Sequence, residues 1–87
     1  MTDRSALTRA FHDALMRRPE VTAGTVNEGA AWLVNAVYGR TMREHFDTDH
    51  PGDIAEGERL GSAGKEGPER EAWLWGYRWS PTEPGGQ

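Results

Sequence analysis

The apolar and polar positions of the first twenty residues predict a short amphipathic helix. Apolar side chains recur at helical spacing over residues 4–17, at Leu7, Ala10, Phe11, Ala14 and Leu15. This i, i+3, i+4, i+7, i+8 pattern places them on one face, which is typical of a helix packed on a protein core. Pro19 ends the helix because proline lacks a backbone donor and clashes with the preceding turn. Residues 19–24 are then expected to form a loop.

A longer helix is predicted over residues 26–46. Thr25 and Glu28 have the spacing of a capping box, in which each side chain binds the other residue's backbone N–H. Its main buried face is predicted to consist of Val26, Ala30, Leu33, Val34, Val37, Tyr38 and Thr41. Trp32 falls on the opposite side, with Ala36, Gly39 and Arg43 near it. A helix with apolar groups on two sides is either packed between elements or part of an interface. Trp32 therefore either packs beneath the C-terminal aromatic residues or anchors a partner.

Glycines at helical spacing mark a third helix, over residues 53–64. Gly57 and Gly61 share a stripe with Ile54 and Leu60. A glycine inside a helix costs roughly 1 kcal/mol relative to alanine. Such a stripe predicts the close approach of another element, which a side chain would block. Gly64 either continues the stripe or ends the helix, since glycine is favoured just after the last turn.

The approaching element is predicted to be a fourth helix, over residues 68–79. Pro68 suits the first helical position, and Glu69 and Glu71 suit the positive end of the helix dipole. One face would carry Trp73, Gly76 and Tyr77, and the other Ala72, Trp75 and Trp79. We expect the first face to lie on the glycine stripe and the second to meet the rest of the protein. The alternative is a strand, because the aromatic residues also alternate at period two.

Two segments within residues 53–79 resemble a known helical hairpin. Gly57-Glu-Arg-Leu-Gly61-Ser-Ala-Gly64-Lys65 and Arg70-Glu-Ala-Trp73-Leu74-Trp-Gly76-Tyr77-Arg78 are similar to the two-helix core of the ribosome modulation factor family. The family's Pro-Tyr turn between the helices is replaced here by a loop with Pro68 alone. The resemblance implies a hairpin and, as a function, association with the ribosome.

Length and composition fit one small all-α domain of four helices over residues 1–80, ending in a Gly/Trp-rich helical hairpin. The chain has 87 residues, of which 36% are hydrophobic and 28% charged. Residues 81–87, rich in Pro and Gly, are predicted to be a disordered tail. No apolar run is long enough to span a bilayer, and Asp3 and Arg4 stand where a signal peptide would turn apolar. We therefore expect a cytoplasmic protein.

The sequence carries no recognisable catalytic chemistry. Ser5, Ser62 and Ser80 lack the setting of a nucleophile, and no glycine-rich phosphate loop follows a strand. We predict no enzyme activity, no cofactor and no metal site. One alternative stays open, since imidazole and carboxylate ligands lie close together at His45, Asp47, Asp49 and His50.

The charge and the aromatic residues predict a binding protein. The net charge is −4, with nine acidic and four basic residues in positions 47–87. This charge makes direct nucleic-acid binding unlikely and favours a protein or ribonucleoprotein partner with a basic surface. Compact acidic inhibitors of nucleic-acid machinery, such as phage-encoded anti-CRISPR proteins, have this general character. The partner-binding residues predicted from exposed aromatics flanked by charge are Trp32, Arg43, Glu69, Glu71, Trp75, Arg78 and Trp79.

Overall fold

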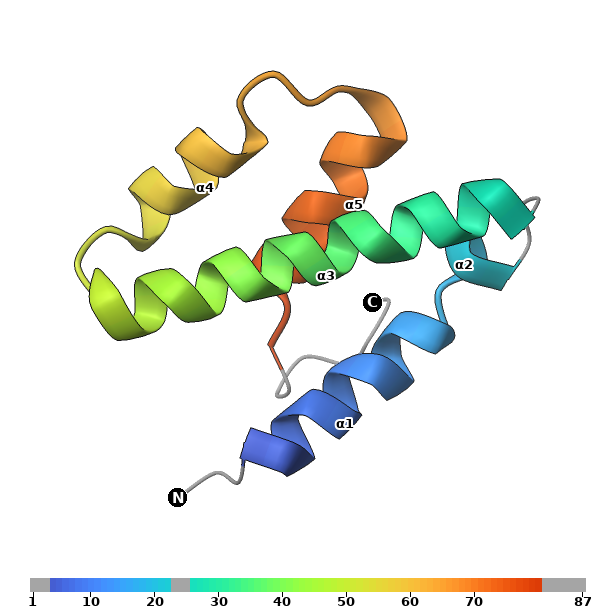
Figure 1. Ribbon diagram of the computed structural model, residues 1–87, viewed down its shortest axis with the longest axis horizontal. Coiled ribbons are helices and arrows are strands. Elements are labelled where there is room, and N and C mark those ends of the chain that lie inside the picture. The colour runs from blue at the N-terminus through green and yellow to red at the C-terminus, as the bar shows by residue number, and fades with distance from the viewer. Residues whose placement is uncertain (1–3, 23–25, 81–87) are drawn as a thin grey trace.

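All regular secondary structure in the described part of the chain is helical. The computed structural model describes residues 4–22 and 26–80 (Figure 1). The helices are α1 (Arg4–Met16), α2 (Pro19–Thr22), α3 (Val26–Asp49), α4 (Ile54–Ser62) and α5 (Gly67–Arg78). The predicted all-α fold is confirmed, and the strand alternative for the C-terminal aromatic residues is wrong. The cap at Thr25 and the tail at 81–87 lie outside the described residues. None of the helices in these two ranges is both long and apolar enough to cross a lipid bilayer.

Two predicted boundaries need correction. Residues 19–22 form a helical turn rather than a loop, because proline is well suited to a first helical position, where no N–H donor is needed. The backbone carbonyl of Val21 lies so near α3 that a Cβ added to Gly29 would stand 2.6 Å from the carbonyl oxygen.

The second correction is that α3 continues to Asp49. Its last turn is extended by a hydrogen bond of 3.0 Å from the His50 N–H to the Phe46 carbonyl, and Pro51 follows.

The fold is centred on the crossing of α3 and α5 (Figure 1). A Cβ added to Gly39 would lie 1.9 Å from the Trp73 carbonyl oxygen, and one added to Gly76 would lie 1.8 Å from that of Ala36. Ala36 and Ala72 are both fully buried. The two backbones are therefore in direct contact, which only residues of this size permit.

The predicted buried face of α3 is correct only in part, since Leu33 and Val37 are partly buried against a hydrophobic cluster of the core while other members of that face are exposed. Tyr38 is 61% exposed and Val34 is 44% exposed, although both were expected in the core. Trp32, Ala36 and Gly39 are buried instead. The reason is the crossing with α5, which requires small residues at the contact. Val34 and Tyr38 consequently point outward.

The predicted hairpin of α4 and α5 is confirmed. A Cβ on Gly61 would lie 2.0 Å from the Trp73 indole, and one on Gly57 would lie 2.6 Å from the Tyr77 hydroxyl. The rings of Trp73 and Tyr77 stack with centroids 4.9 Å apart, covering the glycine stripe. Gly64 lies beyond α4 with φ of +81°, so it ends the helix rather than continuing the stripe.

Helix α5 carries two hydrophobic clusters. The first lies toward α1 and α3, and its buried members are Phe11, Leu15, Trp32, Ala36 and Ala72. The second lies toward α4 and contains Trp73, Leu74 and Tyr77, with Met42 and Ile54 packed against it. The predicted buried face of the first helix is confirmed, since Phe11, Ala14 and Leu15 are its buried residues.

Candidate partner-binding groove

A groove of about 450 Å³ lies between α1, α3 and the end of α5. We call it the α1–α3 groove. Its apolar lining comes from Leu7, Phe11, Val37 and Trp79. Its polar lining comes from Thr8, His12, Arg40, Thr41, Arg43, Glu44, Asp47 and Ser80. The Trp79 ring meets the Phe11 ring edge-on at 5.3 Å, so aromatic side chains connect α1 to α5 beside the groove.

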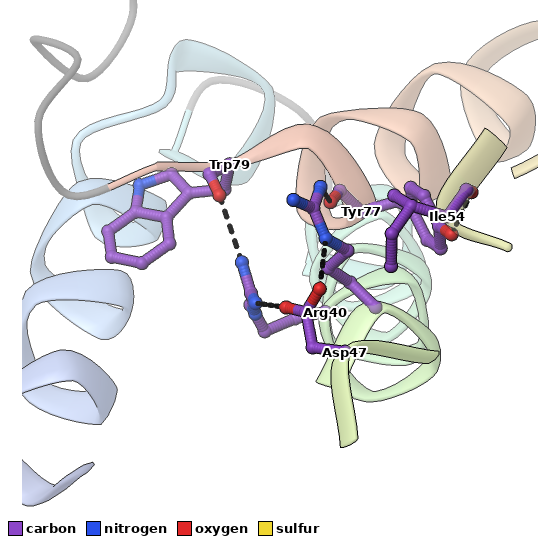
Figure 2. A network of polar contacts seen from close by, with 6 residues as sticks. Arg40, Asp47, Ile54, Tyr77 and Trp79 are labelled. Carbon is purple, nitrogen blue, oxygen red and sulfur yellow. Dashed lines mark hydrogen bonds and ion pairs between the residues drawn. The ribbon is translucent and has the colours of Figure 1, made fainter. Parts of the chain in front are cut away.

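Two arginines of α3 bind the C-terminal end of α5. Arg40 Nη1 donates to the Trp79 carbonyl at 2.9 Å, and Arg43 Nη1 donates to the Tyr77 carbonyl at 3.2 Å (Figure 2). The last carbonyls of a helix lack partners within the helix and carry the negative end of its dipole. The arginines supply these carbonyls with hydrogen-bond donors and with positive charge. They also fix the position of Trp79 beside α1.

Asp47 holds these arginines in place. Its Oδ1 accepts from Arg43 Nε at 3.1 Å, and its Oδ2 lies 3.9 Å from Arg40 Nη2. The Arg40 guanidinium also lies 5.7 Å from the centre of the Trp79 ring. Burial lowers the pKa of Arg40, but an arginine pKa is so high that the side chain stays charged near neutral pH. The groove thus contains a half-buried cation stacked on an indole.

Of the seven predicted partner-binding residues, Arg43 and Trp79 come together in the α1–α3 groove. Trp32 does not join them. It is only 6% exposed and packs against Trp75 with ring centroids 5.7 Å apart. The packing of Trp32 beneath the C-terminal aromatics is therefore confirmed, and Trp32 is not the exposed aromatic that the partner-anchor alternative assumed. The Arg18 guanidinium lies 5.4 Å from the Trp32 ring and 5.2 Å from the half-buried Trp75 ring.

Trp75 and the other three predicted residues do not line the groove. Glu69 and Glu71 are exposed near the start of α5, at the opposite end from Trp79. Arg78 binds Glu58 of α4 through two hydrogen bonds of 2.8 Å. Its role is thus to hold the hairpin together, beside the hydrogen bond from the Tyr77 hydroxyl to the Ile54 carbonyl (Figure 2).

Sequence reasoning missed Arg40 and the contribution of α1 to the groove. The spacing of Arg40, Arg43 and Asp47 does place the three side chains on one face of a helix. The sequence shows this shared face but not the element that it meets, because the carbonyls that Arg40 and Arg43 bind lie more than thirty residues further along the chain.

The possible metal ligands do not assemble into a site. His45 Nδ1 lies 3.0 Å from Asp49 Oδ2, and the rings of His45 and His50 are 5.3 Å apart. Within residues 4–22 and 26–80, no group of three His, Cys, Asp or Glu side chains is placed to hold a metal ion. His45 and Asp49 instead form an i, i+4 pair on the surface of α3.

Comparison of the chain with family models, curated proteins and solved structures found no match in any of the three. The resemblance of residues 53–79 to the ribosome modulation factor family therefore stays a prediction.

Proposed function

We propose that this chain is a non-enzymatic binding protein that regulates or inhibits a larger nucleic-acid-handling assembly by occupying a protein surface, with the partner held at the α1–α3 groove. The observation that carries the proposal is Trp79. This indole is half-buried in a groove that two arginines and two acidic residues also line. A partly exposed aromatic residue surrounded by charge is the usual anatomy of a protein-binding anchor.

The bonding of the charged groups favours a protein segment as the occupant. Arg40 and Arg43 are engaged with the end of α5 and with Asp47. They give the groove a polar rim and leave its apolar surface for side chains of the partner. The net charge of −4 favours a partner with a basic surface and disfavours direct contact with nucleic acid. This is the general type of the phage-encoded anti-CRISPR inhibitors, acting in the cytoplasm.

A ribosome-associated function is a second candidate. The observation in its favour is the packing of α4 on α5, where Gly57 and Gly61 lie beneath Tyr77 and Trp73. These are the residues on which the resemblance to the ribosome modulation factor family rests. Their burial supports a shared hairpin, while the acidic charge of the segment gives little support to binding RNA.

The test is a pull-down from the native cell with mass spectrometry, followed by affinity measurements with the protein identified. Trp79→Ala should cost the complex at least about 2 kcal/mol, the scale of a hot spot. Since Trp79 also packs on Phe11, a second variant is needed that spares the core. Thr8→Lys places a cation in the groove from an exposed position and should weaken binding of a basic partner.

Leu60→Ala is the matched control, since Leu60 is 53% exposed on α4 and does not line the groove. Full affinity for both Trp79→Ala and Thr8→Lys would contradict the proposal.

The salt dependence of binding distinguishes the two candidate functions. A protein contact should weaken only modestly as salt rises, whereas phosphate contacts weaken steeply. Co-sedimentation with ribosomes that is lost at higher salt and competed by free RNA would favour the second candidate.

A further inference from the structure

Both long walls of the α1–α3 groove are helical faces. The lining residues of α3 recur at helical spacing, at Val37, Arg40, Thr41, Glu44 and Asp47. Those of α1 do the same, at Leu7, Thr8, Phe11 and His12. Since Val37 and Asp47 are ten residues apart on one helix, the α3 wall is about 15 Å long.

The groove changes character along its length. Val37 and Trp79 pack against the hydrophobic cluster that contains Phe11, and they form its apolar end. Glu44 lies seven residues beyond Val37, which is two helical turns or about 10.5 Å along α3. Asp47 follows on the next turn. The groove therefore runs from an apolar end to an end with two carboxylates.

Glu44 carries the charge in the groove that has no bonded partner. Arg43 binds Asp47 and the Tyr77 carbonyl, and Arg40 binds the Trp79 carbonyl. The Glu44 carboxylate forms no hydrogen bond or ion pair with any residue in 4–22 or 26–80. Burial lowers the pKa of Arg40, and the charge of Glu44 opposes this shift at longer range.

The groove as a whole is weakly negative. The charges of its two arginines and two acidic residues cancel. The C-terminal end of α5 then adds the negative end of a helix dipole, equivalent to about half an elementary charge. A groove with this charge and an unpaired carboxylate is complementary to a cation at the Glu44 end.

We propose that the occupant of the α1–α3 groove is an amphipathic basic helix of the partner, with an apolar side chain against Val37 and Trp79 and a Lys or Arg bound to Glu44. This inference rests on the proposed function and names the segment that the partner presents. An extended segment would draw its affinity from main-chain hydrogen bonds to a sheet edge, and no residue in 4–22 or 26–80 lies in a strand. A helix satisfies its own backbone and needs only side-chain contacts.

The dimensions set the spacing of the recognised side chains. A helix about 15 Å long and about 10 Å across occupies roughly 1,200 Å³, whereas the groove has a volume of about 450 Å³. The groove therefore receives the side chains of one helical face, and the backbone of the bound helix lies outside. Because Val37 and Glu44 are two turns apart, the apolar anchor and the cation should stand four or seven positions apart on that helix.

The test is selection from a displayed library of randomised peptides of about fifteen residues, a length at which isolated helices begin to form. The full chain is the immobilised target. The selected peptides should carry an apolar residue and a Lys or Arg at the expected spacing. Thr8→Lys should weaken their binding, which places them in the groove.

Charge recognition is tested on one selected peptide. Replacing its cation by Gln should weaken binding to the wild type about fivefold, the upper end for a partly exposed ion pair. On Glu44→Gln the same replacement should change the affinity little, because the partner carboxylate is already gone. Glu69→Gln is the matched control, since Glu69 is exposed and does not line the groove, and it should keep the fivefold difference. Circular dichroism checks that all variants are folded.

A library that yields no groove binder would overturn the inference. So would selected peptides that alternate in the manner of a strand, or an equal fivefold loss on Glu44→Gln. Such a failure is distinguishable from failure of the proposed function. If the natural partner still loses affinity for Trp79→Ala and Thr8→Lys, the groove is the binding site and the basic helix alone is wrong.

Discussion

Four glycines take part in the packing of α5 against α3 and α4, and the sequence revealed two of them. Gly57 and Gly61 form a stripe with apolar neighbours, which predicts close approach to the aromatic residues of α5. Gly39 and Gly76 have no such neighbouring glycine, yet each lies against a backbone carbonyl of the other helix. A lone glycine in a helix does not indicate which element will approach it. The contacts of Gly39 with α5 and of Gly76 with α3 are evident only in the three-dimensional structure.

Gly39→Ala should destabilise the fold by about 1–3 kcal/mol, the usual cost of overpacking. The added Cβ would stand 1.9 Å from the Trp73 carbonyl oxygen, and a backbone atom cannot move aside as a side chain can. This clash should outweigh the gain in helix propensity of about 1 kcal/mol. Urea unfolding measures the change. Gly52→Ala, with no atom within 4 Å of the new Cβ, is the control and should be nearly neutral. Equal stability of the two variants would show that the helices do not touch at Gly39.

At the scale of elements, the sequence predicted the main helix spans better than the orientation of α3. Its apolar pattern ranked Val34 and Tyr38 as core residues because both are large and favour burial. The structure buries Ala36 and Gly39 instead, because contact between α3 and α5 backbones requires small side chains. Hydrophobic periodicity measures how apolar a face is, not how closely another helix can approach it.

The α4–α5 hairpin should lose part of its stability in acid through one ion pair. The two hydrogen bonds from Arg78 lower the pKa of Glu58 below its ordinary value of 4.5. A lowered pKa in the folded state means that the pair stabilises the fold above pH 4.5 and that this contribution is lost as pH falls through the lowered value. Because the Arg78 side chain is 61% exposed, solvent screening limits the effect to about 0.2–1 kcal/mol.

A double-mutant cycle isolates this pair. At pH 7, Glu58→Gln should reduce the free energy of unfolding, and the difference from wild type should vanish once Glu58 is protonated in the folded protein. In an Arg78→Gln background the same substitution should have little effect at either pH. An equal loss in both backgrounds would mean that Glu58 stabilises α4 without the help of Arg78.

At the scale of the whole molecule, the α1–α3 groove is assembled from three distant parts of the chain. Leu7 and Phe11 come from α1, Arg40 and Arg43 from α3, and Trp79 from the end of α5. The sequence indicated Arg43 and Trp79 as binding residues, because exposed aromatics flanked by charge are typical of binding anchors. It could not indicate Leu7 or Phe11 as their neighbours, since the same pattern also describes an ordinary buried helix face.

The central place of α5 predicts that the molecule unfolds in one step. Both hydrophobic clusters are built on this helix, so neither can lose its packing without disturbing the other. In urea, tryptophan fluorescence and far-ultraviolet circular dichroism should give the same midpoint. Phe11→Ala should lower both midpoints together, because removing a buried phenylalanine costs about 3–5 kcal/mol of the 5–15 kcal/mol typical of a whole domain. Phe11 belongs to the first cluster only. If Phe11→Ala produced two separate transitions, with the second retaining the wild-type midpoint, the α4–α5 hairpin would be an independent folding unit.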